Sequence, residues 1–162
     1  MDRHLDEFLE FFFPEVRVDL DLRRGYRPLD KELEQLAAKS RSGLRLADKV
    51  VEVYLRDGSP IALIIHIEVQ GHVDRTFEKR MFTYNYRLFD RFDREVVSLA
   101  VLTDANPEFR PQRLRFERWG YLLRFEFPSV KLLDWNDRTE ELKASRNPFA
   151  LVTLAHLDLQ TC

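Results

Sequence analysis

The sequence is short of cysteine: its only copy is Cys162, the last of the 162 residues. A single cysteine excludes an intramolecular disulfide and a zinc site built from several cysteines. Glycine is also scarce, with 5 copies, and no run of Gly and Ser occurs. We therefore expect no flexible linker and no low-complexity segment. These absences favour one folded domain over the whole chain, 1–162.

Long apolar runs and an excess of basic residues are missing too. No apolar stretch reaches the roughly 18 residues that a membrane-spanning helix needs. The N-terminal segment 1–7 is acidic, whereas a secretory signal begins with basic residues. We expect a soluble, cytoplasmic protein without a membrane partner. The formal net charge is −2, and general nucleic-acid binders are usually basic, so any contact with DNA must come from a local basic patch.

The apolar pattern predicts both strands and helices. The runs 61–70 and 96–102 are suited to buried central strands that lie side by side. Asp57-Gly58 is a turn signal between the first of these runs and a strand over 47–55. Two further strands are expected within 116–134, separated by Pro128. Helices are expected over 8–13 (ended by Pro14), from Lys31 onward (capped by Asp30), and over 76–92, 133–142 and 149–157. This order predicts an α/β fold with a mixed β-sheet flanked by helices.

The triplet Glu68-Val69-Gln70, which closes the first apolar run, is the most informative segment. A carboxylate at the end of a buried strand is costly unless a cation or hydrogen bonds compensate it. Side chains alternate along a strand, so Glu68 and Gln70 share one face. Asp48 lies on the preceding strand of the expected hairpin. It shares that face only if the two residue numbers in each pair of directly opposite residues add up to an even number.

The expected register pairs Asp48 with Glu68, Val50 with His66, and Glu52 with Ile64. An even sum requires a hairpin loop with an odd number of residues, such as three residues with a bulge near Gly58 or Ser59. The carboxylates of Asp48 and Glu68 would then lie within roughly 6 Å of each other, close enough to share one cation.

These residue types suit a metal-dependent phosphodiesterase. Asp48 and Glu68 supply the oxygen ligands that Mg²⁺ or Mn²⁺ prefers, with the carbonyl of Val69 as a third. Such a metal lowers the pKa of a bound water and stabilises charge on the scissile phosphate. Gln70 can orient that water by hydrogen bonds, although an amide cannot act as a general base. The predicted catalytic residues are therefore Asp48, Glu68 and Gln70.

Asp48, the segment 66–71 and the segment 80–91 resemble the Rpn-type family of recombination-promoting nucleases and putative transposases, in the PD-(D/E)XK nuclease superfamily. The similarity extends over nearly the whole chain, from 8–14 to 147–152. It implies a restriction-endonuclease-like core, a divalent metal and DNA cleavage associated with mobile elements. It also implies an acidic residue on the first helix of the core, for which Glu32 and Glu34 are the candidates.

Two positions depart from the family pattern: Gln70 stands where the superfamily has Lys, and Ala47 where a Pro often precedes the Asp. The glutamine in place of lysine and the acidic net charge leave a second interpretation open. The chain would then be a catalytically inactive nuclease-fold module that binds DNA or another protein, or the dimerising half of a divided transposase-like protein.

Several residues have simpler structural interpretations. Asp48 also fits a solvated residue at a strand start, and His66 fits a core histidine better than a metal ligand. We expect Trp119 and Trp135 to be structural, and the aromatic residues from Phe82 to Phe89 to be mostly helix core. Arginines are usually solvated, but some can contact phosphates, and the candidates for DNA contact are Arg75, Arg80 and Arg87.

A homodimer is expected as well. Cleavage of both strands of a duplex with one active site per chain calls for two chains, and two-fold dimers are the commonest oligomers. The Phe-rich N-terminus and the apolar segment 149–152 are the surfaces that the sequence offers for such a contact.

Overall fold

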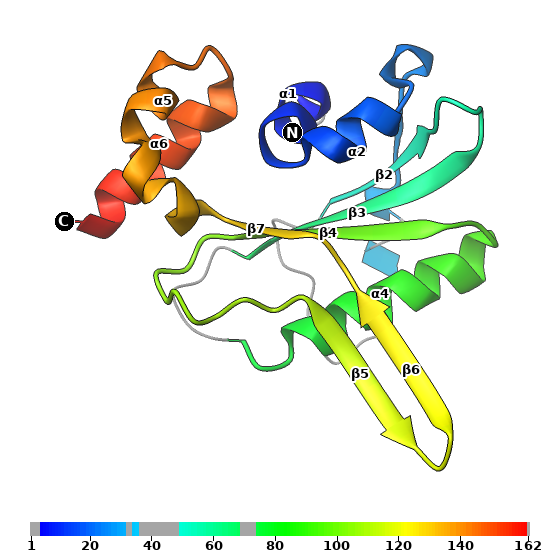
Figure 1. Ribbon diagram of the computed structural model, residues 1–162. Helices are drawn as coiled ribbons and strands as arrows, with labels where there is room; N and C mark the ends of the chain where they lie inside the picture. The colour runs from blue at the N-terminus through cyan, green and yellow to red at the C-terminus, as the bar shows by residue number, and fades with distance from the viewer. Residues whose placement is uncertain (1–3, 32–33, 36–48, 69–73, 162) are drawn as a thin grey trace.

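The computed structural model describes residues 4–31, 34–35, 49–68 and 74–161, with the backbone alone over 62–68. Five strands form the main sheet in the order β1-β2-β3-β4-β7 (Figure 1). Their bounds are Arg27–Pro28, Lys49–Tyr54, Pro60–Glu68, Val96–Leu102 and Ser129–Lys131. The pairs β1–β2 and β2–β3 are antiparallel, whereas β3–β4 and β4–β7 are parallel. The predicted mixed α/β arrangement is therefore confirmed.

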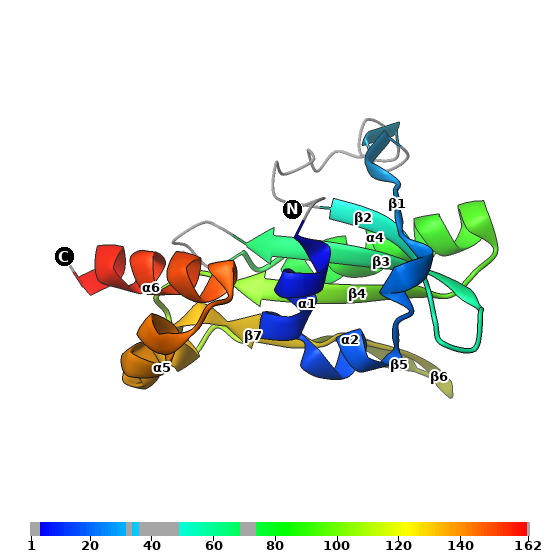
Figure 2. The same cartoon turned by 90° about the horizontal axis from the view of Figure 1, so that it is seen from above.

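Helices cover both faces of this sheet (Figures 1 and 2). Helices α1 (Leu5–Phe12) and α2 (Pro14–Asp19) lie on one face, and α4 (Phe77–Phe92) lies on the other. The chain ends with the 3₁₀ helix η2 (Leu132–Arg138) and the helices α5 (Thr139–Ala144) and α6 (Pro148–Thr161). A further 3₁₀ turn, η1, spans Leu22–Arg24. None of the described helices combines the length and the apolar character that a membrane crossing requires.

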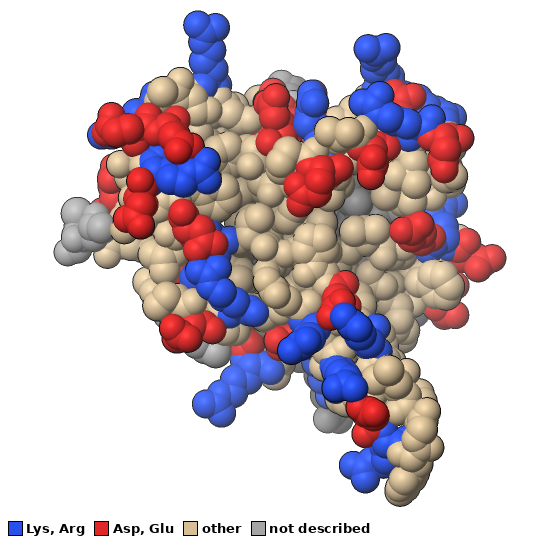
Figure 3. Space-filling view, in the orientation of Figure 1, with Lys and Arg blue, Asp and Glu red and all other residues tan. Residues whose placement is uncertain are grey.

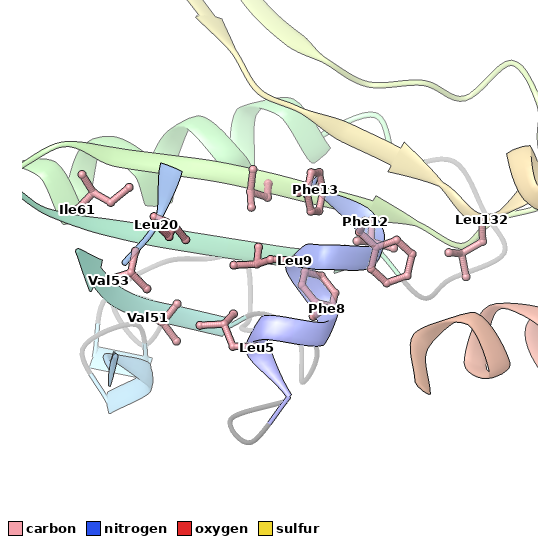
Figure 4. Close-up of a cluster of buried hydrophobic side chains, with 12 residues drawn as sticks. Leu5, Phe8, Leu9, Phe12, Phe13, Leu20, Val51, Val53, Ile61 and Leu132 are labelled. Carbon is pink, nitrogen blue, oxygen red and sulfur yellow. The ribbon is translucent and has the colours of Figure 1, made fainter. Parts of the chain in front are cut away.

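The core beneath α1 forms because side chains alternate along the strands. Odd-numbered strand residues such as Val51 and Val53 share one core cluster with the apolar face of α1 (Figure 4). Leu99 of β4 belongs to the same cluster. On the opposite face, even-numbered strand residues pack against α4. The predicted stripe of α4 is confirmed, since its four members are all fully buried: Phe77, Met81, Tyr84 and Leu88.

The predicted end of the first helix before Pro14 is confirmed, since α1 ends at Phe12. Pro14 then begins a second helix, α2, because proline is compatible with the first position of a helix. The phenylalanines expected to supply a dimer surface are core residues instead: Phe8 and Phe13 are each 1% exposed, and Phe12 is 6% exposed. The other expected contact surface, 149–152, does expose apolar side chains, since Leu151 is 57% and Val152 is 59% exposed.

A second, two-stranded sheet consists of β5 (Arg113–Arg118) and β6 (Tyr121–Glu126). This hairpin projects away from the body of the molecule (Figures 1 and 2). The predicted break at Pro128 is confirmed, since β6 ends before it and β7 begins after it. The bounds of β4 are also those predicted, and α4 begins one residue later than expected.

Candidate functional site

In the β2–β3 hairpin, the numbers of directly opposite residues add up to an even number, as the metal-site hypothesis requires. Val50 lies opposite Ile64, and Glu52 lies opposite Ala62. The predicted pairs, Val50 with His66 and Glu52 with Ile64, are wrong because the register is displaced by two residues. A displacement of two residues leaves the faces unchanged, since side chains alternate with a period of two.

The parity follows from the loop that joins the two strands. The N–H of Leu55 donates to the carbonyl of Ser59 at 2.8 Å, so three residues, 56–58, form the loop between this pair. Gly58 has a φ of 93°, in the region that glycine adopts readily. The carboxylate of Asp57 accepts a hydrogen bond from the N–H of Ser59 at 2.8 Å, which holds the pKa of Asp57 below its usual value. The prediction that the hairpin loop has an odd number of residues is confirmed, and the residue with positive φ in it is Gly58.

Of the three predicted metal ligands, only Glu68 lies among the residues that the structure describes. Asp48, Val69, Gln70 and Glu32 lie outside the described residues. Glu68 is the last residue of β3, and its backbone pairs with Leu102 at the end of β4. The separation of the two carboxylates therefore remains a prediction. Glu34, the other acidic candidate, is exposed.

An ion pair fixes the start of α4. Nη1 of Arg80 donates to Oδ2 of Asp74 at 2.9 Å, and both side chains are largely buried. The other oxygen of Asp74 accepts hydrogen bonds from the N–H and the hydroxyl of Thr76, at 2.9 and 2.7 Å. Because Phe77 and Met81 of the same helix pack against Ala100 and Leu102, this ion pair lies beside the carboxyl end of β4.

The three arginines proposed to contact DNA differ in exposure. Arg75 is exposed and Arg87 is half-buried. Arg80 is buried, and its guanidinium group is bonded to Asp74. We infer that Arg80 positions α4.

A second buried ion pair lies immediately after β4, and no local pattern in the sequence predicts it. Nζ of Lys131, on β7, donates to both carboxylate oxygens of Asp104 at 2.8 Å. It also donates to the carbonyl of Phe109 at 3.1 Å. Both charged side chains are 1% exposed. The pair thus joins β7 to the segment that follows β4.

The carboxylate of Glu52 is also buried, in the middle of β2. It is bonded to two arginines, Arg27 at 3.3 Å and Arg94. Two guanidinium groups compensate the cost of burying the carboxylate, which makes Glu52 a structural residue. In the part of the chain that the structure describes, no group of three or more His, Cys, Asp or Glu side chains is arranged to hold a metal ion.

Two predictions about aromatic residues need correction. Tyr84 of α4 is buried as expected, but Tyr86 and Phe89 are 45% and 53% exposed. Trp135 is structural, since its ring stacks on Phe11 with centroids 5.3 Å apart. Trp119 is 95% exposed and contributes nothing to the core.

Comparison of the chain with protein-family models, with curated proteins and with solved structures finds no match in any of the three.

Proposed function

We propose that the chain is a metal-dependent DNA endonuclease with its active site at the end of β3. The observation that carries the proposal is the even register of the β2–β3 hairpin, set by a three-residue loop. An odd register would have excluded Asp48 and Glu68 as ligands of one metal ion. The crossover through α4 to a parallel strand, β4, supports the further proposal of a restriction-endonuclease-like core.

Asp48 and Glu68 would hold Mg²⁺ or Mn²⁺ through carboxylate oxygens, which are the ligands that hard divalent cations prefer. When bound, such an ion supplies an activated water and stabilisation of phosphate charge. The side-chain amide of Gln70 would orient the attacking water by hydrogen bonds. Arg75 and Arg87 would contact the DNA backbone. The resemblance to the Rpn-type nucleases favours DNA as the substrate.

The test measures nicking of supercoiled plasmid DNA in Mg²⁺ or Mn²⁺. Asp48→Ala and Glu68→Ala should abolish cleavage, because each removes a metal ligand, and neither should lower the thermal unfolding temperature. Gln70→Ala should reduce the rate by about 10²-fold or less, because it removes orientation and not charge. Gln70→Lys should retain both fold and activity. Glu95→Ala, which removes an exposed carboxylate next to β4, is the matched control and should cut like the parent.

Full activity in Asp48→Ala or Glu68→Ala would remove that residue from the mechanism. A parent protein that binds DNA but does not cut it with either metal would support the alternative, an inactive nuclease-fold module. Binding of Mn²⁺ by titration calorimetry, lost in both carboxylate variants, would separate a failed metal site from a failed catalytic step.

A further inference from the structure

The β5–β6 hairpin, residues 113–126, forms an arm with its own structural character. Its two strands pair from Arg113 opposite Glu126 to Arg118 opposite Tyr121, which leaves a two-residue turn at Trp119-Gly120. At the base of the arm, Phe125 packs against Phe82 of α4, with ring centroids 5.5 Å apart. The far end projects from the body of the molecule (Figure 1). An isolated two-stranded hairpin is only marginally stable, so an arm of this kind gains from a partner.

The far half of the arm, residues 116–123, exposes large apolar side chains. The exposed fractions are 95% for Trp119, 58% for Tyr121, 54% for Leu122 and 50% for Phe116. Phe116 and Tyr121 lie on one face of the hairpin and Leu122 on the other, because side chains alternate across it. The apolar surface therefore extends around the whole end of the arm.

Trp119 is an unusual residue for its position. It has a φ of 52°, and Gly120 follows with a φ of 82°. Turns that need positive φ at both central residues strongly prefer Asn, Asp or Gly at the first. The indole is almost fully exposed, with the guanidinium carbon of Arg118 5.5 Å from the ring centroid. Disfavoured backbone conformations often mark functional positions, and exposed tryptophans are frequent anchors of interfaces.

The charges of the arm indicate which class of partner it fits. The whole arm, 113–126, has four arginines and two glutamates, but residues 116–123 contain one of each, so the excess positive charge lies toward the base. The two glutamates are paired on their own strands, Glu117 with Arg115 at 2.5 Å and Glu126 with Arg124 at 2.8 Å. Figure 3 shows both positive and negative side chains along the arm, with uncharged surface at its outer edge. A nucleic acid would require uncompensated positive charge at the contact, whereas the outer end suits an apolar protein surface.

The exposed area is sufficient for association of two copies. Aromatic side chains bury about 150–250 Å² each, so the exposed fractions of the three aromatic side chains amount to about 400 Å² per chain, and Leu122 adds up to about 100 Å². Two copies would bury about 800–1,000 Å², which is the size of a small interface. A two-fold contact uses the same patch on both chains, and a neutral apolar patch can pack against itself without repulsion.

We propose that the ends of two β5–β6 arms pack against each other and make the chain a homodimer, with Trp119 as the central anchor. This inference is independent of the proposed nuclease activity. It rests on the exposure, backbone conformation and charge of the arm.

The experiment compares the parent with Trp119→Asn by analytical ultracentrifugation over a range of concentrations. Asn is favoured at the first position of this turn, so the variant keeps the fold and loses only the indole. The parent should sediment at about twice the 19.4 kDa mass of one chain. The dissociation constant should rise by about 30-fold or more in Trp119→Asn, as expected for a central interface residue.

Leu122→Asn should also weaken the dimer. Leu151→Asn on α6 tests the other surface expected for a dimer, the segment 149–152, with a side chain of similar exposure: Leu151 is 57% exposed and Leu122 is 54% exposed. If the arms form the contact, Leu151→Asn should dimerise like the parent. A parent that stays monomeric at about 100 μM, a concentration where even weak interfaces assemble, would overturn the proposal. A dimer that dissociates in Leu151→Asn but not in Trp119→Asn would also overturn it. The same holds for a monomeric protein that binds duplex DNA or lipid vesicles and loses affinity for them in Trp119→Asn.

Discussion

At the scale of single residues, Lys131 carries a charge that the fold protects almost completely from solvent, since its side chain is 1% exposed. Its ammonium group is held by both oxygens of Asp104 and by the carbonyl of Phe109, with the Phe109 ring centroid 5.8 Å away. The desolvation cost of such a pair can equal or exceed the attraction between its charges. Removing one partner should therefore destabilise the protein much more than replacing both partners with apolar residues.

We predict that Lys131→Met lowers the free energy of unfolding by about 3–5 kcal/mol, because the carboxylate of Asp104 is left buried without its cation. Urea denaturation measures the change. The double variant Asp104→Leu with Lys131→Met should lose less than the sum of the two single changes. Lys143→Met, which removes an exposed lysine paired with Glu140, is the control and should leave the denaturation midpoint unchanged. An additive double variant would show that the two charges do not depend on each other.

The role of a residue could be predicted from the sequence where it depends on a local pattern. It could not be predicted where it depends on a partner far away in the chain. The four buried side chains of α4 follow from helical spacing alone. Lys131 and Asp104 are 27 positions apart, and nothing near either residue indicates that the two side chains meet. The sequence predicts a structural role for Trp119, whereas the turn at the end of a projecting hairpin leaves this residue exposed.

At the scale of elements, the β2–β3 hairpin depends on Gly58. We predict that Gly58→Ala lowers the free energy of unfolding by about 1–2 kcal/mol, because a side chain disfavours positive φ. The new Cβ would lie 3.4 Å from Nη1 of Arg24, a flexible group that can move aside. Gly58→Asn is the comparison and should lose less stability, since Asn tolerates this backbone conformation. Chemical denaturation distinguishes the two, and equal losses would locate the cost in packing instead of φ.

The segment before β5 is attached to η2 by Arg110 and Asp134, whose groups form two hydrogen bonds of 2.9 and 2.5 Å. The hydrogen bond from Arg110 lowers the pKa of Asp134 below its usual value of 3.8. A lowered pKa in the folded state stabilises the protein above the unfolded pKa, and this contribution is lost as the pH falls through the folded pKa.

We therefore predict that Asp134→Asn is less stable than the parent by about 0.5 kcal/mol near pH 6, a value reduced by the exposure of the pair. The difference should shrink as the pH falls below 3.8. Thermal unfolding of both proteins from pH 6 to pH 2.5 measures it. A difference that persists at the lowest pH would mean that the hydrogen-bonding geometry matters and the charge of Asp134 does not.

Local signals predicted most of the elements. Apolar periodicity placed α4 and β4 to within one residue, and Asp57-Gly58 placed the hairpin turn. The exact register of β2 against β3 was not predictable, because a shift of two residues keeps the same faces and changes only which side chains are neighbours. The same limit applies to the candidate site, where the sequence predicted the parity of the strands but not the offset between them.

At the scale of the whole molecule, α1 joins the sheet to the C-terminal helices. Phe8 packs against Phe12 and Phe149, with centroids 5.0 and 5.3 Å apart. Nδ2 of Asn147 donates to the carbonyl of Glu7 at 2.9 Å, which ties the start of α6 to the same helix. The first and last elements of the chain thus close one core, an association that no local pattern in the sequence indicates.

We predict that Phe8→Ala lowers the free energy of unfolding by about 3–5 kcal/mol, because it leaves a cavity in a core where Phe8 is 1% exposed. Urea denaturation followed by circular dichroism is the measurement. Val18→Ala on α2, where the side chain is 60% exposed, is the control and should change stability little. A small loss in Phe8→Ala would show that α1 can separate from the sheet without disrupting it.

The three-residue loop of the β2–β3 hairpin also determines which mutations the gene can tolerate there. Deleting or inserting one codon within either strand would move every following side chain of that strand to the opposite face, because side chains alternate with a period of two. Codons gained or lost within the loop would alter only its length, since the paired residues keep their partners. Among related genes, length variation should therefore fall within this loop and not within β2 or β3.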